Sequence, residues 1–375
     1  MDDFKDFKVL ELASVLAGPS VGQFFAELGA TVIKVENMAG GGDITRSWKL
    51  AGEQTDDRSA YFTSVNWGKK SVALDLQTSA GREAVRKLAS RSDLVIASYK
   101  PGDAGKLGVD YASLIALNPA LIYAQITGYG SSNPRVGYDA VLQAETGYMF
   151  MNGEPGNTSL KMPVALIDVL AAHHLKEGIL LALLQRTRTG LGRLVEVSLV
   201  QAAVASLVNQ ATNWLVAQRL PQKQGSSHPN IAPYGDVFKT QDDQEVILAI
   251  GSDRQFSDLC RILDIAASAQ EERFQTNRMR VEHRLELNSV LQSRMGQYPA
   301  TVLMPRLHEA KIPAGAIQSM DKVFAMPEAQ ALLIEGAGLR GIRSFVAQGV
   351  GGEHPLLPPP RFGEHTEEVL RTIGT

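Results

Sequence analysis

The chain has 375 residues, of which 44% are hydrophobic and 21% charged, and its formal net charge is -3. This length is too great for one small core and predicts about two or three domains, with the composition of a folded, soluble protein. The weak negative charge argues against nucleic acid or an anionic membrane as a partner. An acidic start without a signal peptide, and no apolar run long enough to span a bilayer, predict a cytoplasmic protein.

Short apolar strands alternate with helices in the first part of the chain. The strands are predicted over Lys8–Leu12, Thr31–Val35, Ser71–Leu74, Leu94–Ala97 and Leu121–Ala124, and the helices over Ser20–Leu28, Thr78–Ser90 and Tyr111–Ala116. This alternation predicts an α/β fold with a parallel sheet covered on both faces. Ligands bind beyond the carboxyl ends of such strands, so the loops after Leu12, Val35, Ala97 and Ala124 are the predicted binding region.

The second part of the chain changes character after a segment rich in glycine, serine, proline and asparagine at 221–233. Before it, Pro163–Leu184 and Gln201–Leu220 are predicted helices that flank a strand at Leu194–Val197. Beyond it, strands are predicted at Tyr234–Thr240 and Glu245–Ile250, helices over Phe256–Ala310, and a terminal helix at Thr366–Ile373. A domain boundary is therefore expected at 221–233.

Asp168 stands within the apolar run Val164–Leu170. An ionised carboxylate among apolar neighbours is unfavourable unless it is capped, paired or protonated. One interpretation makes Asp168 the N-cap of the helix that follows. Another makes it a nucleophile that the helix N-terminus keeps ionised, and the sequence allows both roles together.

Several familiar signals are incomplete. Gly40–Gly42 lacks the lysine and hydroxyl residue of a phosphate-binding P-loop, and no GxGxxG follows the first strand. His173 and His174 are adjacent and not spaced as metal ligands, so no metal is predicted. The single cysteine, Cys260, cannot form an intrachain disulfide, and buried packing is a more common role for it than a catalytic thiol.

A series of different short motifs extends along nearly the whole chain. They are Ala17-Gly18-Pro19, Val32-Ile33-Lys34-Val35-Glu36, Gly42-Asp43 with Arg46, Lys69-Lys70-Ser71-Val72, Pro101-Gly102, Lys106-Leu107-Gly108, Thr127-Gly128-Tyr129-Gly130, Gly137-Tyr138-Asp139, His228-Pro229-Asn230 and Gly363-Glu364-His365-Thr366. With Asp168 placed after Pro163 and before an apolar helix, this series resembles the class III CoA-transferases, also called the CaiB/BaiF family.

The resemblance implies a fold and an activity. The implied fold is a large Rossmann-like CoA-binding domain from residues 1–220 together with 331–375, a linker at 221–233 and a smaller α+β domain at 234–330, assembled as an interlocked homodimer. The implied reaction moves CoA from an acyl-CoA to a free carboxylic acid, with Asp168 as the covalent carrier. Coenzyme A and acyl-CoA are then substrates, and no tightly bound cofactor is expected.

The resemblance also implies which side chains contact the substrates. The CoA-binding positions are Val15, Leu16, Asn37, Lys69, Lys70, Ser98, Tyr99 and Lys106. The positions for the acyl group or acceptor are Trp48, Tyr138, Gly225 and His228. Asn37 and Lys106 stand where arginine is frequent in the family, which removes two-pronged phosphate contacts, and of a glycine-rich loop only Gly225 remains.

Other roles remain open for these residues. Each lysine is equally typical of a solvated surface, Trp48 of a loop anchor, and His228 of a hydrogen-bonded structural residue. A racemase or isomerase of the same superfamily is one alternative activity, but its members carry histidine where Tyr138 stands, and a phenol is a poor base near neutral pH. A non-catalytic acyl-CoA binding protein is the other. Similarity of the His228-Pro229-Asn230 segment to dicarboxylate-using members predicts succinyl-CoA as the donor.

Overall fold

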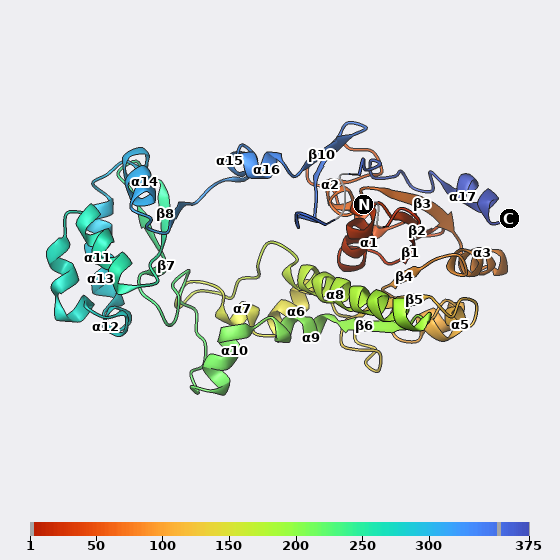
Figure 1. The fold of residues 1–375 in the computed structure, drawn as a ribbon, viewed down its shortest axis with the longest axis horizontal. Helices are drawn as coiled ribbons and strands as arrows, with labels where there is room; N and C mark the ends of the chain where they lie inside the picture. The colour runs from red at the N-terminus through yellow and green to blue at the C-terminus, as the bar shows by residue number, and fades with distance from the viewer. Residues whose placement is uncertain (1–3, 351–353, 375) are drawn as a thin grey trace. The chain divides into compact units, whose positions relative to one another are not determined.

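The computed structural model describes residues 4–350 and 354–374 (Figure 1). Their contacts divide the chain into two compact units. The first contains the described residues within Met1–Thr146, Met162–Val208 and Glu328–Thr375, and the second contains Gly147–Lys161 and Asn209–Pro327. No helix of the described residues is both long and apolar enough to cross a membrane.

A six-stranded parallel sheet organises the first unit. Its strands are β1 (Lys8–Leu12), β2 (Thr31–Asn37), β3 (Lys69–Leu74), β4 (Leu94–Ala97), β5 (Ile122–Thr127) and β6 (Leu194–Ser198). They lie in the order β3-β2-β1-β4-β5-β6, and every pair is parallel. The predicted α/β fold is confirmed for this sheet. The direction of strand addition reverses between β1 and β4, which is where open parallel sheets bind ligands.

Helices cover both faces of this sheet. The helices of the first unit are α1 (Ala17–Glu27), α2 (Ala60–Thr63), α3 (Ser79–Ala89), α4 (Asp103–Leu107), α5 (Tyr111–Ile115), α6 (Asp139–Glu145), α8 (Leu166–Thr189), α9 (Leu199–Ala205) and α17 (Thr366–Thr372), with the 3₁₀ helix η1 (Ile44–Ser47). Val95 packs in one core with residues of α3, α5 and α17. Its neighbour Ile96 points to the opposite face, where it faces Gly18 of α1, and α8 packs against α1 and β5.

The end of the chain returns to the first unit. The hairpin of β10 (Leu333–Gly336) and β11 (Leu339–Ile342) lies in this unit, and α17 contacts β3. The His365 backbone N–H donates to the Ser71 carbonyl at 2.9 Å, and the Thr366 hydroxyl oxygen accepts from the Ala73 N–H at 3.0 Å. These bonds fix the terminal helix at the edge of the sheet.

The second unit has its own core. Its antiparallel sheet contains β7 (Tyr234–Lys239), β8 (Glu245–Ala249) and β9 (Ala314–Ala316), in that order. The unit also contains α7 (Tyr148–Met151), α10 (Val208–Leu215), α11 (Asp253–Ile262), α12 (Asn277–Glu282), α13 (Arg284–Met295), α14 (Ala300–Glu309), α15 (Met320–Val323) and two 3₁₀ turns, η2 (Ala266–Gln270) and η3 (Glu272–Phe274), while α16 (Pro327–Gln330) starts where the unit ends. Phe238, Leu248, Leu259 and Cys260 are among its buried residues, so Cys260 is a packing residue.

One predicted helix is wrong. Gln201–Leu220 was expected to be continuous, but it is interrupted between α9 and α10. Val208 has φ 39°, in the left-handed region that a β-branched residue rarely adopts. A helix cannot continue through that conformation, so the break follows from the backbone at Val208.

Candidate active site

A cavity of about 290 Å³ opens at the carboxyl edge of the parallel sheet in the first unit. Loops after β1, β4 and β5 line it, together with the starts of α6, α8 and α9, whereas the loop after β2 does not. Its lining residues are 14–18, 98–101, 126–128 and 135–139, with Asp168 and Leu199. The cavity therefore lies at the point where the strand order reverses.

Asp168 is held in the first turn of α8, on the wall of this cavity. The helix begins at Leu166 after the cap position Ala165, so the interpretation of Asp168 as the N-cap is wrong. The capping oxygen comes from a different part of the chain, because Oδ1 of Asp139 accepts the backbone N–H of Ile167 at 2.7 Å. The carboxylate of Asp168 is thereby left to face the cavity.

Asp139 connects two helices of the site. Its Oδ2 accepts a hydrogen bond from Nε2 of Gln143 at 2.7 Å, and Oε1 of Gln143 accepts the Met162 N–H at 2.8 Å. The Gln143 side chain is buried, so these bonds have low competition from water. They tie α6 to the segment that leads into α8 and so fix the position of Asp168.

Two carboxylates share this site, and the consequence is electrostatic. Burial, followed by the nearby charge of Asp139, raises the pKa of Asp168 from 3.8 to about 7. Both causes disfavour the ionised form. At neutral pH the side chain is therefore an equilibrium mixture of acid and carboxylate, and a small change in its surroundings alters the ionised fraction.

Asp139→Asn is expected to lower the pKa of Asp168, because it removes a nearby like charge. With Asp168 as the nucleophile that the sequence resemblance implies, kcat/KM should fall about tenfold for each pH unit below this pKa in the wild type, because only the carboxylate can attack a thioester. Asparagine removes the like charge but retains an oxygen for the Ile167 N–H. The acid limb of kcat/KM should move to lower pH by less than half of the difference between the ordinary pKa of 3.8 and the raised pKa of about 7, because burial is the larger cause of that difference. An unmoved acid limb would show that another group controls it.

Tyr61 is close to the two carboxylates and was not predicted from the sequence. Burial raises the pKa of its hydroxyl, and the charges of Asp168 and Asp139 raise it further. Its ring meets that of Trp48 edge to face, with centroids 5.1 Å apart. Trp48 is 40% exposed. The sequence-predicted Trp48 is thus connected to the site through Tyr61, although it does not line the cavity.

Two cations of the cavity were also missed by the sequence interpretation. Lys100 follows the predicted Ser98 and Tyr99, and Arg135 precedes the predicted Tyr138. The Arg135 guanidinium lies over the Tyr129 ring at 4.2 Å and pairs with Glu145 at 2.6 Å. Both residues stand close in sequence to predicted site residues, and this was the one indication available for them. Sequence alone does not tell which side chains of a loop face the cavity.

Half of the predicted CoA-binding positions meet at this cavity. Val15 and Leu16 come from the loop after β1, and Ser98 and Tyr99 from the loop after β4. The Ser98 hydroxyl accepts the Ser14 N–H at 3.3 Å, which links the two loops. Tyr138 lines the cavity as well and is 61% exposed.

The other four predicted CoA-binding positions do not line it. Asn37 ends β2, and its side-chain oxygen accepts the Ala39 N–H at 3.1 Å. Lys70 pairs with Glu368 at 2.6 Å. Lys106 pairs with Asp103 at 2.8 Å on an exposed helix. These three side chains have partners within the first unit, and their role toward CoA stays a prediction.

Lys69 is in a different environment, fully buried beneath α1. Its Nζ lies 2.8 Å from Oε2 of Glu11 and donates to the Pro19 carbonyl and to Oδ1 of Asn66. Burial lowers the pKa of this ammonium to about 8, although the charge of Glu11 opposes the change. A phosphate contact would require this arrangement to open, so the structure gives Lys69 a structural environment.

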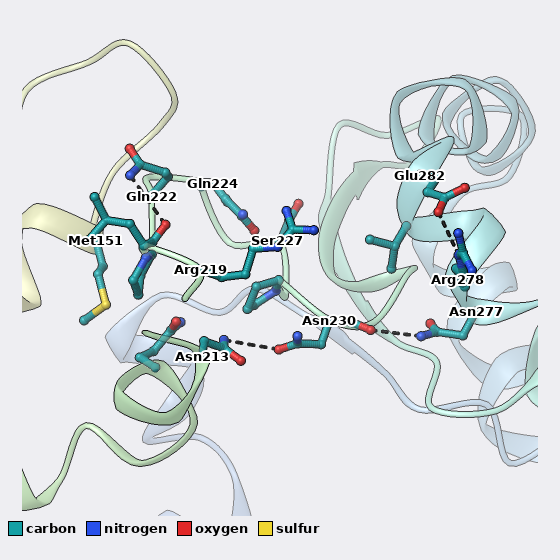
Figure 2. A pocket seen from close by; sticks show the side chains of 16 residues that line it. Met151, Asn213, Arg219, Gln222, Gln224, Ser227, Asn230, Asn277, Arg278 and Glu282 are labelled. Atoms are coloured by element: carbon teal, nitrogen blue, oxygen red, sulfur yellow. Dashed lines mark hydrogen bonds and ion pairs between the residues drawn. The ribbon is translucent and has the colours of Figure 1, made fainter. Parts of the chain in front are cut away.

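Gly225 and His228 belong to the second unit. Gly225 lines a cavity of about 790 Å³ that is walled largely by polar side chains, and Figure 2 shows the bonds from Asn213 to Asn230 and from Asn277 to the Asn230 carbonyl. His228 does not line that cavity. Its Nδ1 accepts the Asn230 N–H at 3.1 Å and its ring packs on Tyr234 with centroids 5.2 Å apart. These contacts hold the imidazole within the second unit, and its role toward a substrate carboxylate stays a prediction.

Known proteins resemble this chain over almost its full length. The family model "CoA-transferase family III" matches residues 4–366. A succinate–glutarate CoA-transferase of Agrobacterium fabrum is 38% identical, with 98% of this chain and 95% of the relative covered. A succinyl-CoA:glutarate CoA-transferase of Homo sapiens is 32% identical over 98% of this chain and 85% of the relative. The crystal structure of a CaiB/BaiF family protein from Brucella suis superposes with a TM-score of 0.86 at 38% identity, covering 98% of both chains. The combination of fold, sheet-edge cavity and full-length similarity shows that the chain belongs to CoA-transferase family III, the class III CoA-transferases.

Proposed function

We propose that this enzyme transfers CoA from an acyl-CoA to a free carboxylic acid through covalent intermediates on Asp168. The observation that carries the proposal is the position of the Asp168 carboxylate, partly desolvated on the wall of the cavity where the strand order reverses. Desolvation strengthens a carboxylate as a nucleophile toward a thioester, provided that the thioester is held in place.

The proposed reaction proceeds by four acyl transfers. The Asp168 carboxylate attacks the donor thioester carbonyl, the carbon–sulfur bond breaks, and CoA leaves as a thiolate from a mixed anhydride. The thiolate then attacks the Asp168 carbonyl, which releases the donor acid as a carboxylate and leaves an aspartyl-CoA thioester. The acceptor carboxylate attacks this thioester to form a second anhydride and thiolate. Attack of the thiolate on the acceptor carbonyl yields the new acyl-CoA and regenerates the carboxylate.

The side chains around the cavity fit this proposal in their chemistry. Lys100 and Arg135 supply positive charge for the phosphates of CoA, and arginine can bind a phosphate through two nitrogens. Val15, Leu16 and Tyr138 supply an apolar wall for the thioester end of the substrate. Asp139 and Gln143 hold the start of α8, so that the nucleophile is oriented before the substrate arrives.

The relatives indicate the substrate class. The two relatives described above are named for succinate or succinyl-CoA and for glutarate. We therefore propose succinyl-CoA as the donor and a short dicarboxylic acid as the acceptor. An interlocked homodimer is part of the same proposal, and the exposed leucines 180, 181 and 184 of α8 support it, because a row of exposed apolar side chains is typical of a surface that another chain covers.

Trapping of the intermediate tests the mechanism. Incubation with succinyl-CoA followed by hydroxylamine should convert Asp168 to a hydroxamate, because anhydrides and thioesters react with this amine whereas a free carboxylate does not. Peptide mass spectrometry should find the modification at Asp168. Turnover without any modification of Asp168 would contradict the covalent route. Exchange of the α-hydrogen of the acyl group with deuterated solvent, in the absence of an acceptor acid, would instead indicate a racemase or isomerase.

A further inference from the structure

Val15 has an unusual backbone conformation at the wall of the active-site cavity. Its φ is 72°, in the left-handed region, where a β-branched side chain is disfavoured by its own backbone. Such a conformation costs about 1–3 kcal/mol and persists only where surrounding interactions hold it. Val15 lies between the end of β1 and the start of α1, and together with Leu16 it lines the cavity that contains Asp168.

A buried carboxylate holds this conformation. Both oxygens of Asp43 accept the Val15 N–H, at 3.3 Å and 3.2 Å. Asp43 is only 5% exposed, and its Oδ1 also accepts from the backbone N–H and the hydroxyl of Thr45. Its own N–H donates to Glu36 at 2.8 Å. The acceptor of the strained N–H is therefore itself fixed from several sides.

A buried lysine completes the support. Nζ of Lys34, on β2, lies 2.9 Å from Oδ2 of Asp43 and donates to the Ala13 carbonyl at 2.8 Å. The ion pair thus contacts the loop at two points, the Ala13 carbonyl and the Val15 N–H. Burial alone would raise the pKa of Asp43, but Lys34 and the bonds from Thr45 hold it below its usual value. The carboxylate is consequently charged at every pH at which Asp168 is ionised.

We propose that Asp43 and Lys34 are positioning residues that hold the loop of residues 13–16 in its strained form, so that Val15 and Leu16 present the acyl-CoA to Asp168. The contacts of Asp43 and Lys34 with Val15 and Ala13 support their role in holding the loop. The consequence for turnover rests on the proposed function. The strained conformation would relax without the ion pair, and Val15 and Leu16 would leave the cavity wall. A displacement of about 1 Å at a reacting centre can lower a rate by about a hundredfold.

The test measures single-turnover labelling of Asp168 by succinyl-CoA in Asp43→Asn and Asp43→Glu. Asparagine removes the charge, whereas glutamate keeps the pairing with Lys34 and displaces the oxygens from the Val15 N–H. Both variants should lower the labelling rate and kcat about 10- to 100-fold, with a smaller effect on KM. Asp43→Glu separates a positioning role from a role in folding. It should unfold at a higher free energy than Asp43→Asn, because it keeps the ion pair with Lys34, and its labelling rate should still fall.

Val15→Gly provides the internal check. Glycine adopts a positive φ without steric cost, so a loop with glycine depends less on Asp43. The loss caused by Asp43→Asn should therefore be smaller in the Val15→Gly background than in the wild type. Asp56→Asn is the matched control, since Asp56 pairs with Arg58 and Arg361 in the same unit without contacting the loop, and its kcat should equal the wild-type value.

The outcomes distinguish this inference from the proposed function. Absence of labelling in the wild type would contradict the covalent mechanism itself. Normal labelling in the wild type with equally fast labelling in both Asp43 variants would overturn the positioning role. An equal loss in the wild-type and Val15→Gly backgrounds, or a crystal structure of Asp43→Asn in which Val15 keeps its positive φ, would overturn it as well.

Discussion

Asp168→Asn is expected to lower kcat for CoA transfer by at least about a thousandfold, because the proposed covalent route would lose its nucleophile. Asparagine has nearly the same shape as aspartate, but its amide does not attack a thioester. No hydrogen bond of the Asp168 side chain is found within residues 4–350 and 354–374, so the substitution removes no described partner. The variant should fold and bind CoA with an affinity close to that of the wild type.

Steady-state transfer and calorimetric CoA binding are the measurements, with Asp168→Ala as a second variant that cannot deamidate back to aspartate. Retention of more than about a tenth of the wild-type turnover in Asp168→Ala would contradict covalent catalysis on this side chain. Loss of CoA binding together with loss of turnover would show that Asp168 supports the cavity and not only the reaction.

The same substitution should stabilise the protein at high pH. The folded-state pKa of Asp168 is raised, so its carboxylate costs stability as pH rises from 3.8 toward about 7, and the cost persists above that pH. Asparagine removes this cost. Because the side chain is partly solvated, the gain in unfolding free energy should be about 1 kcal/mol larger at about pH 8.5 than at about pH 5.5. A carboxylate that destabilises its own fold in this way is consistent with the proposed role of Asp168.

The parallel sheet could be predicted because its information is local. Val9, Leu10, Val95 and Ile96 lie in short apolar runs, and both runs occur as strands with the predicted ends, β1 and β4. The loops after these two strands were accordingly among the predicted binding loops, and both line the cavity. Strand alternation and the rule for ligand sites in parallel sheets were sufficient for this much of the site.

The contacts that orient Asp168 could not be predicted in the same way. The cap of α8 comes from Asp139, 28 residues before Ile167, and nothing in the local pattern pairs them. Gly128 and Gly137 are a similar case. A Cβ on Gly128 would lie 2.7 Å from the Gly137 backbone nitrogen, so both loops depend on glycine for their close approach, yet each glycine alone indicates only a turn.

The sequence shows the charged residues within the strands but not which residues they pair with. Glu11 and Lys34 each interrupt an apolar strand, and a charge in such a strand requires a partner. The partners become evident only from the sheet order, which places β2 beside β1 with Glu11 opposite Lys34. Sequence similarity assigned Lys69 to CoA binding, and the fold surrounds it with Glu11 and Asn66, so its role toward CoA stays a prediction. Such contacts depend on burial, which is a property of the tertiary structure.

Lys34→Met is expected to lower the free energy of unfolding by about 3–5 kcal/mol, an unusually large effect for one side chain. Lys34 is 1% exposed, and it is bound by Oε1 of Glu11 at 3.0 Å and Oδ2 of Asp43 at 2.9 Å. Burial alone would lower the pKa of this ammonium, but the charges of Glu11 and Asp43 raise it, so the cation is required by its neighbours. Methionine fills a similar volume, removes the cation that pairs with Asp43, and leaves Glu11 paired with Lys69.

Urea unfolding followed by circular dichroism measures the loss. Lys70→Met on β3 is the control, since Lys70 pairs with Glu368 at the surface and its removal should change stability little. Asp43→Asn in the Lys34→Met background should recover part of the loss, because it removes the charge left unpaired, so the two substitutions should be less than additive. A loss for Lys34→Met no larger than that for Lys70→Met would mean that water or proton uptake neutralises the carboxylates. The buried charge would then contribute little to the fold, and the loop that it contacts beside Asp168 would need another source of support.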